Sequence, residues 1–264
     1  MSWTSLLLGA LLAAAIAAAA YALGSLSASG ALGAVLVGTL TFGVGGLIPA
    51  ILLILFFVSS SALSRLGKAR KRAVAAAFAK GSRRDLGQVL ANGSIAAALS
   101  VAFGMTGQPL WLAGVVGALA AVNADTWATE LGVLAGHRPR LITTGQPVDP
   151  GTSGGVSLEG TLASAAGATL IGLAAALPSG DWSLVGLAAL GGVAGSMIDS
   201  LLGATVQAIY WCSACSKETE RHPLHTCGTP TTNHHGWRWL GNDGVNFAAS
   251  LVGAGLAVLI SSLR

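Results

Sequence analysis

Two carboxylates lie where a membrane protein should hold only hydrocarbon. Asp125 and Glu130 belong to the segment NADTWATELG (123–132), near the end of an apolar stretch that begins around Leu110. Ionisable residues inside a membrane span are costly and usually functional. On a helix, Asn123 and Glu130 share one face, whereas Asp125 lies about 140° from Glu130. We therefore interpret the two acids as site residues, with carboxylates neutralised only for packing as the alternative.

A second polar stripe runs through GSMIDSLLGATVQ (195–207). Its members follow the spacing i, i+3, i+4, i+7 and i+11, so on a helix they share one face. They are Ser196, Asp199, Ser200, Gly203 and Gln207. A stripe of serine and glycine alone is typical of a helix-packing seam. The acid at its centre favours a site in which Asp199 is catalytic and the other residues line a substrate groove.

A glycine- and hydroxyl-rich turn lies in DPGTSGGVSLEGTLAS (149–164), just before an apolar run. Backbone N–H groups in such a turn, at the start of a helix, are suited to holding phosphate. The predicted phosphate-binding residues are Thr152, Ser153, Gly154 and Gly155. No Walker A sequence follows, and a flexible linker is the alternative. Glu159, four residues beyond the last of these glycines, favours the functional interpretation.

A basic segment, KGSRRDLGQVLANG (80–93), enters another apolar run. Polar acceptors beside its cations suggest that they clamp an anion at the membrane surface. The predicted anion-binding residues are Lys80, Arg83, Arg84 and Asn92. For the earlier basic cluster, Arg65 to Arg72, we favour contact with the lipid surface.

Cysteines and histidines with metal-ligand spacing occupy the last polar segment. The candidate ligands are Cys212, Cys215, His225 and Cys227, with His222, His234 and His235 competing for the fourth place. Thiols on a cytoplasmic face stay reduced, so a disulfide is not expected. Because the spacing is shorter than in most zinc ribbons, we favour a metal-free loop over structural zinc.

That segment ends in GWRWLGNDGVNF (236–247), where Asn242, Asp243 and Asn246 exceed what helix capping needs. Carboxylate and amide oxygens suit magnesium, which usually bridges substrate phosphates. The predicted magnesium ligands are Asn123, Asp125, Glu130, Glu159, Asp199, Asn242 and Asp243. With cations and backbone amides offsetting phosphate charge, these residues favour phosphoryl or nucleotidyl transfer. The expected catalytic residues are Asp125, Glu130 and Asp199.

These residues need a membrane fold to position them. Of 264 residues, 53% are hydrophobic and only 9% charged, against about 25% charged in soluble domains. The composition predicts an all-α, polytopic integral membrane protein with one transmembrane domain, 1–264. About eight windows approach the length of one bilayer crossing, within a range of six to eight. The windows are 4–23, 29–46, 48–63, 90–106, 110–135, 157–178, 183–209 and 244–262.

Basic residues fix the expected orientation. Thirteen of the fourteen Lys and Arg residues fall in three polar connections, 64–89, 136–156 and 210–243. Eight spans put these connections on one face, which the positive-inside rule makes cytoplasmic, with both termini outside. We expect a bacterial inner (cytoplasmic) membrane with the site at its cytoplasmic face. The net charge of +4 follows from these loops and does not indicate nucleic-acid binding.

Four segments in this order and spacing resemble one known family: NADTWATELG, PGTSGGVSLEGTLAS, GSMIDSLLGATVQ and GWRWLGNDGVNF. They look like the transmembrane-protein-nineteen family, formerly a domain of unknown function, which includes the plant phytyl-phosphate kinase of vitamin E (tocopherol) synthesis. The resemblance covers nearly the whole chain. It implies a kinase that uses a nucleoside triphosphate, with CTP as the expected donor, to convert a prenyl monophosphate into the diphosphate.

Other functions stay open at this point. A CTP-dependent lipid-phosphate cytidylyltransferase or a prenyl alcohol kinase would use the same metal and nucleotide. An ion-coupled transporter would bind its ion through Asp125 and Asp199. Transporters of that kind are built from internal repeats with midplane sites, whereas we find no repeat here and the acids cluster toward one mouth.

Overall fold

The computed structural model describes residues 3–67 and 83–264, and these are predominantly helical. The helices are α1 (Trp3–Ala22), α2 (Ala28–Gly43), α3 (Leu47–Arg65), α5 (Leu86–Thr106), α6 (Pro109–Ala135), α7 (Leu158–Ser179), α8 (Ser183–Thr205) and α9 (Asn242–Ser262). Seven of them are long and apolar enough to cross a membrane, and α2 is shorter, with 16 residues. This confirms the predicted all-α membrane fold.

Helix boundaries agree with the predicted windows to within three residues, except that α5 begins at Leu86 rather than at 90 and α8 ends before 209. The second and third windows form a tight hairpin: α2 ends at Gly43 and α3 begins at Leu47, with Gly46 at φ +86° between them. The window 183–209 was too long, because α8 ends at Thr205. Gln207 therefore lies beyond the helix and does not continue the predicted stripe.

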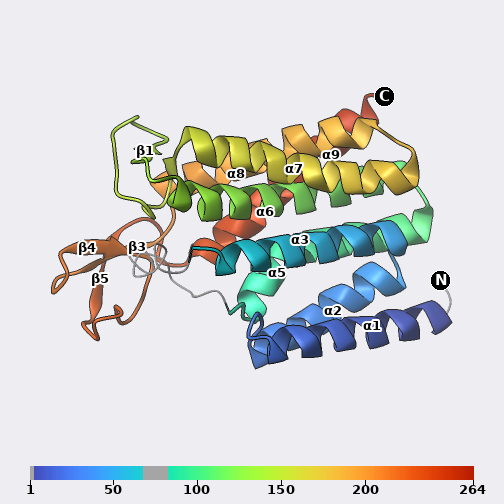
Figure 1. Ribbon diagram of the computed structural model, residues 1–264, viewed down its shortest axis with the longest axis horizontal. Coiled ribbons are helices and arrows are strands. Elements are labelled where there is room, and N and C mark those ends of the chain that lie inside the picture. The colour runs from blue at the N-terminus through green and yellow to red at the C-terminus, as the bar shows by residue number, and fades with distance from the viewer. Residues whose placement is uncertain (1–2, 68–82) are drawn as a thin grey trace.

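Helix α6 is the centre of the bundle. It packs against α3, α5, α7, α8 and α9, and 72% of its most apolar window is buried. Helices α1 and α2 pack on each other, and α2 contacts α5, so this pair adds to one side of the bundle (Figure 1). The part of α6 from Leu112 to Ala124 is thus surrounded by protein rather than lipid.

Glycines allow α6, α8 and α9 to approach at backbone distance. A Cβ atom at Gly117 of α6 would lie 2.3 Å from the carbonyl oxygen of Gly253 in α9. A Cβ at Gly191 of α8 would lie 2.8 Å from the same oxygen. Since dispersion contacts, rather than hydrophobic exclusion, hold membrane helices together, such close contact stabilises the bundle.

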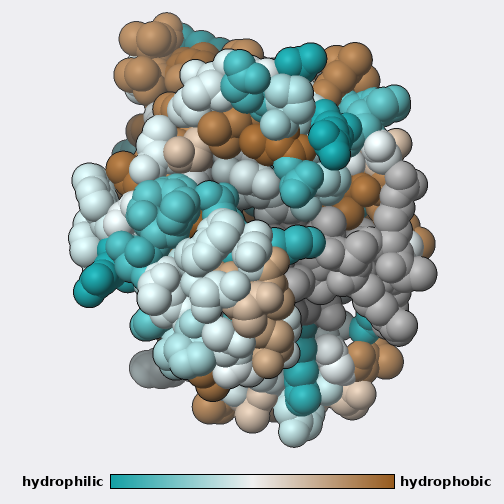
Figure 2. Space-filling model, turned by 90° about the vertical axis from the view of Figure 1, so that its left-hand side faces the viewer, coloured by the Kyte–Doolittle hydropathy of each residue, from teal (hydrophilic) through white to brown (hydrophobic). Residues whose placement is uncertain are grey.

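The described parts of the long connections lie at one end of the bundle, and both termini lie toward the other (Figure 1). One connection carries an antiparallel pair, β1 (Arg140–Leu141) and β2 (Gly155–Val156). Another carries a three-stranded antiparallel sheet of β3 (Ile209–Cys212), β4 (Lys217–Thr219) and β5 (Thr231–His235), in the order β4-β3-β5. Seen from this end, polar side chains cover much of the surface (Figure 2).

Labelling from each side of the membrane tests the predicted orientation. We expect Thr144→Cys, on the β1–β2 loop, to react from the cytoplasmic side and Gln108→Cys, between α5 and α6, only from the other side. Both native side chains are exposed, and they lie at opposite ends of α6. Because the native protein has three free cysteines, the measurement is the number of labels per chain in each variant minus that in the native protein. Reaction of both from the same side would contradict the predicted orientation.

Substitution of the contact glycine tests the packing of α6. We expect Gly117→Ala to lower the free energy of unfolding by about 1–3 kcal/mol, the usual range for overpacking a core. Gly255→Ala is the matched control, because its Cβ would meet nothing within 4 Å. Thermal unfolding in detergent measures the difference, and equal midpoints for the two variants would contradict this account.

Candidate functional site

A cavity of about 1050 Å³ opens at the end of the bundle that carries the connections. Its wall combines the ends of α6 and α8, the start of α9 and the three connections. Both polar and apolar side chains contribute; Phe56, Val133 and Met197 are among the apolar ones. The cavity lining therefore shows which of the predicted site residues, from separate segments of the sequence, come together.

Carboxylates face this cavity from different elements. Asp125 comes from α6, Asp199 from α8 and Glu220 from the residue after β4. The three lie near enough for their charges to repel one another. Within the described structure, Oδ2 of Asp199 is buried and has no hydrogen-bond partner. A buried carboxylate oxygen without a partner is costly, so this group requires a cation or a donor from outside the chain.

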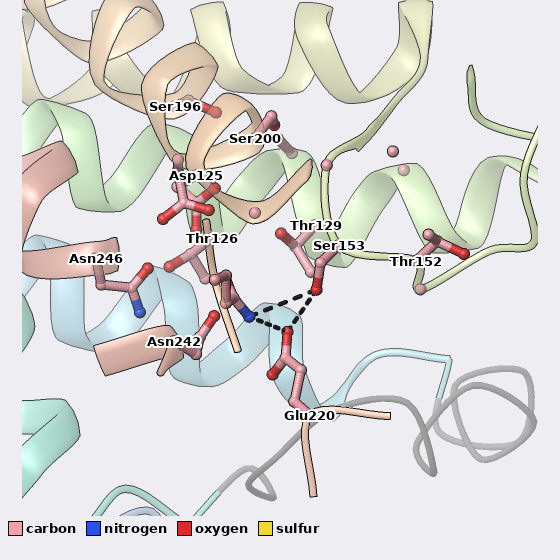
Figure 3. A pocket seen from close by; sticks show the side chains of 18 of the residues that line it. Asp125, Thr126, Thr129, Thr152, Ser153, Ser196, Ser200, Glu220, Asn242 and Asn246 are labelled. Carbon is pink, nitrogen blue, oxygen red and sulfur yellow. Dashed lines mark hydrogen bonds between the residues drawn. The ribbon is translucent and has the colours of Figure 1, made fainter. Parts of the chain in front are cut away.

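Glu220 is held by a small hydrogen-bond network (Figure 3). The Ser153 hydroxyl and the Gln207 side-chain amide both donate to Oε1 of Glu220, each at 2.7 Å. Although Gln207 lies beyond α8, the network still brings it to the cavity wall. The sequence did not single out Glu220, because it lies in a bend after β4, where no periodic pattern marks a residue.

The start of α9 adds amide and carboxylate oxygens. Asn242, Asp243 and Asn246 line the cavity, while the N-cap is Gly241, which makes no side-chain capping bond. None of these three residues is the N-cap of α9. The sequence had suggested this, because it holds more polar residues here than capping needs. Asn242 and Asn246 lie on the same side of the cavity in Figure 3.

The glycine-serine turn, Thr152–Gly155, packs directly on α8. A Cβ atom at Gly154, where φ is +80°, would lie 2.4 Å from Cβ of Ala204. A Cβ atom at Gly203 would lie 3.1 Å from the backbone nitrogen of Gly154. The predicted phosphate turn and the predicted substrate groove, which includes Ser196 and Ser200, therefore adjoin along one wall of the cavity.

The predicted basic residues separate into two environments. Arg84 lines the cavity, donates to the Ser61 hydroxyl at 3.0 Å and lies over the rings of Phe56 and Phe57. Burial lowers the pKa of Arg84 below its ordinary value, and the nearby Glu130 carboxylate opposes that change. Arg83 is not brought to the cavity.

Arg83 instead joins the basic segment to the first helical hairpin. It donates from Nε to the carbonyl of Leu26 at 2.9 Å and lies over the Tyr21 ring. Asn92 does line the cavity, and its amide donates to the Gln88 carbonyl at 2.8 Å. Lys80 lies outside the described residues.

Two further arginines that the sequence analysis counted only as loop charges line the cavity. Arg221 follows Glu220, and its Nε is buried with no hydrogen-bond partner in the described part of the chain. Arg238 lies in the segment before α9. Together with Arg84, they give the cavity cations from three segments that are distant in sequence. Such an arrangement suits a ligand with several negative charges.

Glu130 lies in the cavity wall, whereas two other predicted metal ligands do not. The Ser64 hydroxyl donates to Glu130. Asn123 is fully buried between helices: it accepts from the Ser59 hydroxyl at 2.9 Å and donates to the Gly167 carbonyl at 2.8 Å. Asn123 is thus a polar contact that joins α3, α6 and α7.

Glu159 is the other residue that the structure does not bring to the cavity. Its carboxylate pairs with Nδ1 of His137 at 2.6 Å on the exposed surface of the connection. The N-cap of α7 is Ser157, which accepts from the Gly160 backbone. Proximity in sequence to the glycine-serine turn therefore did not indicate proximity to the site.

The acids in the cavity could hold magnesium if a substrate phosphate supplied further oxygen ligands. Asp125, Asp199 and Asp243 offer carboxylate oxygens, and the partnerless oxygen of Asp199 is suited to a cation. Within residues 3–67 and 83–264, however, these acids do not form a ready-made metal site. The one group of three or more His, Cys, Asp or Glu side chains close enough to share an ion is a Cys/His group outside the cavity. Because magnesium is commonly held by one or two carboxylates and substrate phosphates, the acids fit a metal that arrives with a phosphate ester.

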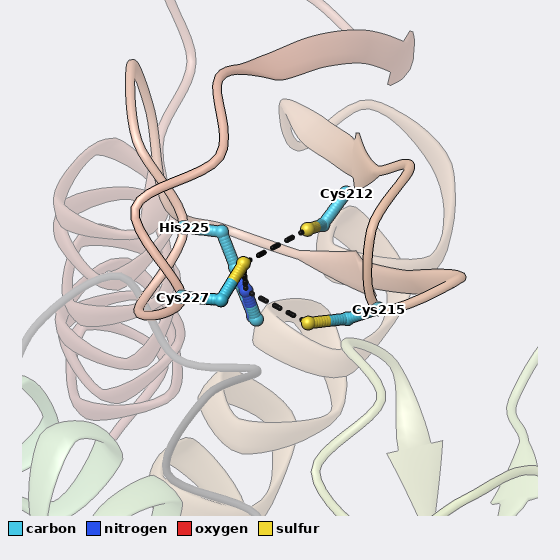
Figure 4. A group of neighbouring side chains, drawn as sticks. All are labelled: Cys212, Cys215, His225 and Cys227. Carbon is cyan, nitrogen blue, oxygen red and sulfur yellow. Dashed lines mark hydrogen bonds between the residues drawn. The ribbon is translucent and has the colours of Figure 1, made fainter.

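The Cys/His group consists of Cys212, Cys215, His225 and Cys227, whose ligand atoms all lie within 4.8 Å of one another (Figure 4). The pKa of Cys227 is lowered to about 5, first by its hydrogen bond with Thr229 and then by that with His225. The pKa of Cys215 is raised to about 11, mainly by its contact with Cys227. This group lies beside the cavity wall, not in it.

Comparison with known proteins adds to this geometry. The sequence profile described as "Integral membrane protein DUF92" matches residues 11–254. Protein PGR of Arabidopsis thaliana is 37% identical over 275 residues, covering 93% of this chain and 92% of that protein. An uncharacterized membrane protein of Methanocaldococcus jannaschii is 35% identical over 234 residues, covering 88% and 84%.

A further relative matches over a shorter region. Protein VTE6, chloroplastic, of Arabidopsis thaliana is 35% identical over 143 residues, which cover 52% of this chain and 43% of that protein. No solved structure matches this chain.

Proposed function

The chain belongs to the DUF92 family of integral membrane proteins, as its four motifs predicted, and on this premise we propose that it is a membrane-embedded prenyl-phosphate kinase. The proposed reaction transfers a phosphoryl group from a nucleoside triphosphate, with CTP as the expected donor, to a prenyl monophosphate. The products are a prenyl diphosphate and a nucleoside diphosphate. The resemblance of the four motifs to a family that includes phytyl-phosphate kinase supports this choice of acceptor.

One observation carries the proposal: acids, arginines and a glycine-serine turn line a single cavity where the membrane helices meet their connections. A reaction between a nucleotide and a lipid phosphate needs such a position, because one substrate is soluble and the other is anchored in lipid. Two phosphorylated substrates also bring more negative charge than a neutral wall could stabilise.

The proposed roles of the cavity residues follow from their charges. Arg84, Arg221 and Arg238 would bind phosphate oxygens and offset their charge. Asp125 and Asp199 would hold the magnesium ion, which, when bound, supplies charge neutralisation at the transferring phosphoryl group. Positioning and electrostatic stabilisation supply most of the catalysis in phosphoryl transfer, so no protein nucleophile is required.

The prenyl chain needs an apolar path beside the charged groups. Phe56, Val133 and Met197 contribute apolar surface to the same cavity, and the small residues Ser196, Ser200 and Gly203 leave room next to it. We propose that the acceptor phosphate lies near Asp199 with the start of its isoprenoid chain along this wall. The site would face the cytoplasm of a bacterial inner membrane, where nucleotide is available.

Labelled CTP tests the proposal against its competitors. Purified protein is incubated with magnesium, prenyl phosphates or prenyl alcohols of several lengths, and CTP labelled at either the α- or the γ-phosphate. Transfer of γ-label to a prenyl monophosphate supports the kinase. Transfer of α-label indicates a cytidylyltransferase, and γ-label on a prenyl alcohol indicates an alcohol kinase. Transfer of neither label would contradict all three and favour a transporter.

Removing either central acid should abolish the transfer. We expect Asp125→Asn and Asp199→Asn each to lose at least about a hundredfold in turnover, equivalent to about 2.7 kcal/mol of barrier. Asparagine keeps the shape but removes the charge that holds a cation. Asp181→Asn is the matched control, because Asp181 is exposed at the opposite end and only caps Ser183. Turnover above about a tenth of native in both site variants would refute their assignment.

The adjacent arginines provide a matched pair for nucleotide binding. We expect Arg84→Ala to raise the KM for nucleotide roughly tenfold to a hundredfold, since a charge-assisted hydrogen bond contributes about 1.5–3 kcal/mol. Arg83→Ala should leave this KM near the native value, because Arg83 contacts Leu26 and Tyr21 instead. Steady-state kinetics with each substrate varied in turn decides the matter. An effect of Arg84→Ala on the lipid alone would assign this arginine to the acceptor phosphate.

A further inference from the structure

We propose that Cys212, Cys215, His225 and Cys227 bind one zinc ion whose role is structural. These residues belong to the finger, the three-stranded sheet with its loops (residues 209–235). The four side chains come from both loops of the finger and turn toward a common point (Figure 4). The proposal rests on this convergence and does not depend on the proposed kinase activity.

Three distances between the ligand atoms are close to those of a tetrahedral site, and all four atoms lie within 4.8 Å of one another. Zinc bonds of about 2.3 Å to sulfur and 2.0–2.1 Å to nitrogen place neighbouring ligand atoms roughly 3.6–3.8 Å apart. The sulfur atoms of Cys212 and Cys227 are 3.6 Å apart, and Sγ of Cys215 lies 3.5 Å from Nδ1 of His225. The same nitrogen lies 3.2 Å from Sγ of Cys227. Small shifts of these side chains would bring the four ligand atoms around one small ion.

The alternative of a disulfide does not fit. A disulfide joins sulfur atoms at about 2.05 Å, whereas the closest approach of Cys212 to Cys227 is 3.6 Å and all three cysteines are free. A set of three thiolates and one imidazole is typical of structural zinc, because no coordination position is left for water or substrate. The short ligand spacing in the sequence had favoured a metal-free loop, but distance in space, not in sequence, decides coordination.

Local structure explains how a short segment brings the ligands together. Cys212 ends β3, and Cys215 lies in the turn to β4, where Ser216 adopts a positive φ of +50°. His225 and Cys227 lie in a second turn that the His225 backbone closes with Thr229 and Gly228. Each pair of ligands therefore sits on one tight turn, as in other small zinc modules.

The finger also lacks the apolar core that would hold it without a metal. Among its residues, the buried apolar side chains are Ile209, Tyr210 and Cys212. A three-stranded sheet with so few buried residues is too small to be stable alone, and small modules commonly use a metal as a staple. Zinc would contribute the missing stability by fixing the two turns.

This staple has a consequence for the cavity. Glu220 and Arg221 lie between the two pairs of ligands in the sequence and line the cavity. The zinc ion would therefore act at a distance, as a support that keeps these two side chains in place. Its loss should disorder the finger before it affects the membrane helices.

Metal analysis of the purified protein tests the site. We expect one zinc per chain in the native protein, and less than about a tenth of that in Cys215→Ser and His225→Ala, because a structural site needs all four ligands. His234→Ala is the matched control, since His234 is also a finger histidine but pairs with Glu218. Absence of zinc from the native protein, iron in its place, or full zinc in both ligand variants would overturn the proposal.

A second measurement needs no variant and so does not depend on their folding. In the native protein the three thiols should react slowly with a maleimide and become reactive when a zinc chelator is added. Reconstitution with cobalt should produce the visible absorption of a tetrahedral cobalt–thiolate site. Equal thiol reactivity with and without chelator would overturn the proposal. If the native protein contains zinc but shows no kinase activity, the proposed function is contradicted and the zinc site is not.

Discussion

Repulsion between partly buried carboxylates is the constraint from which the site follows. Asp125 and Asp199 face each other's charge from two helices of a membrane bundle, and Glu220 approaches from outside. Water screens these charges less between helices than on a soluble surface, so the carboxylates need nearby cations or hydrogen-bond donors. The arginines around the cavity supply part of this positive charge. The partnerless oxygen of Asp199 shows that a further cation or donor is still needed.

The helix packing below the cavity determines where the carboxylates lie. On α6 and α8 the contact residues recur every four positions and end in the acids. Gly117 precedes Ala121 and Asp125, while Gly191 precedes Gly195 and Asp199. A Cβ at Gly195 would lie 2.4 Å from that of Ala121. Small residues therefore close the contact between α6 and α8 along these two stripes, and the stripes open into the polar cavity at Asp125 and Asp199.

Hydropathy was sufficient to predict the helices, because a bilayer imposes one length and one composition on each span. It could not tell which neighbour a side chain meets. Arg83 and Arg84 are adjacent, yet only Arg84 lines the cavity. Asn123 shares a face with Glu130 but lies about 10 Å deeper along the helix, where α3 and α7 surround it.

Cations and acids reach the cavity from different kinds of structure, and this division explains why Glu220 and the extra arginines escaped sequence analysis. In the described residues, Arg84, Arg221 and Arg238 all come from segments outside the helices. Most of the acids come from helix ends. A long arginine side chain reaches inward from a loop without its backbone entering the bilayer, so the positions that supply charge have no helical periodicity. Their convergence depends on the turn at Ser153 and on the finger, which meet at Glu220. A phosphate ester bound there would contact both the membrane helices and the connections, so its binding would hold the two parts of the protein together.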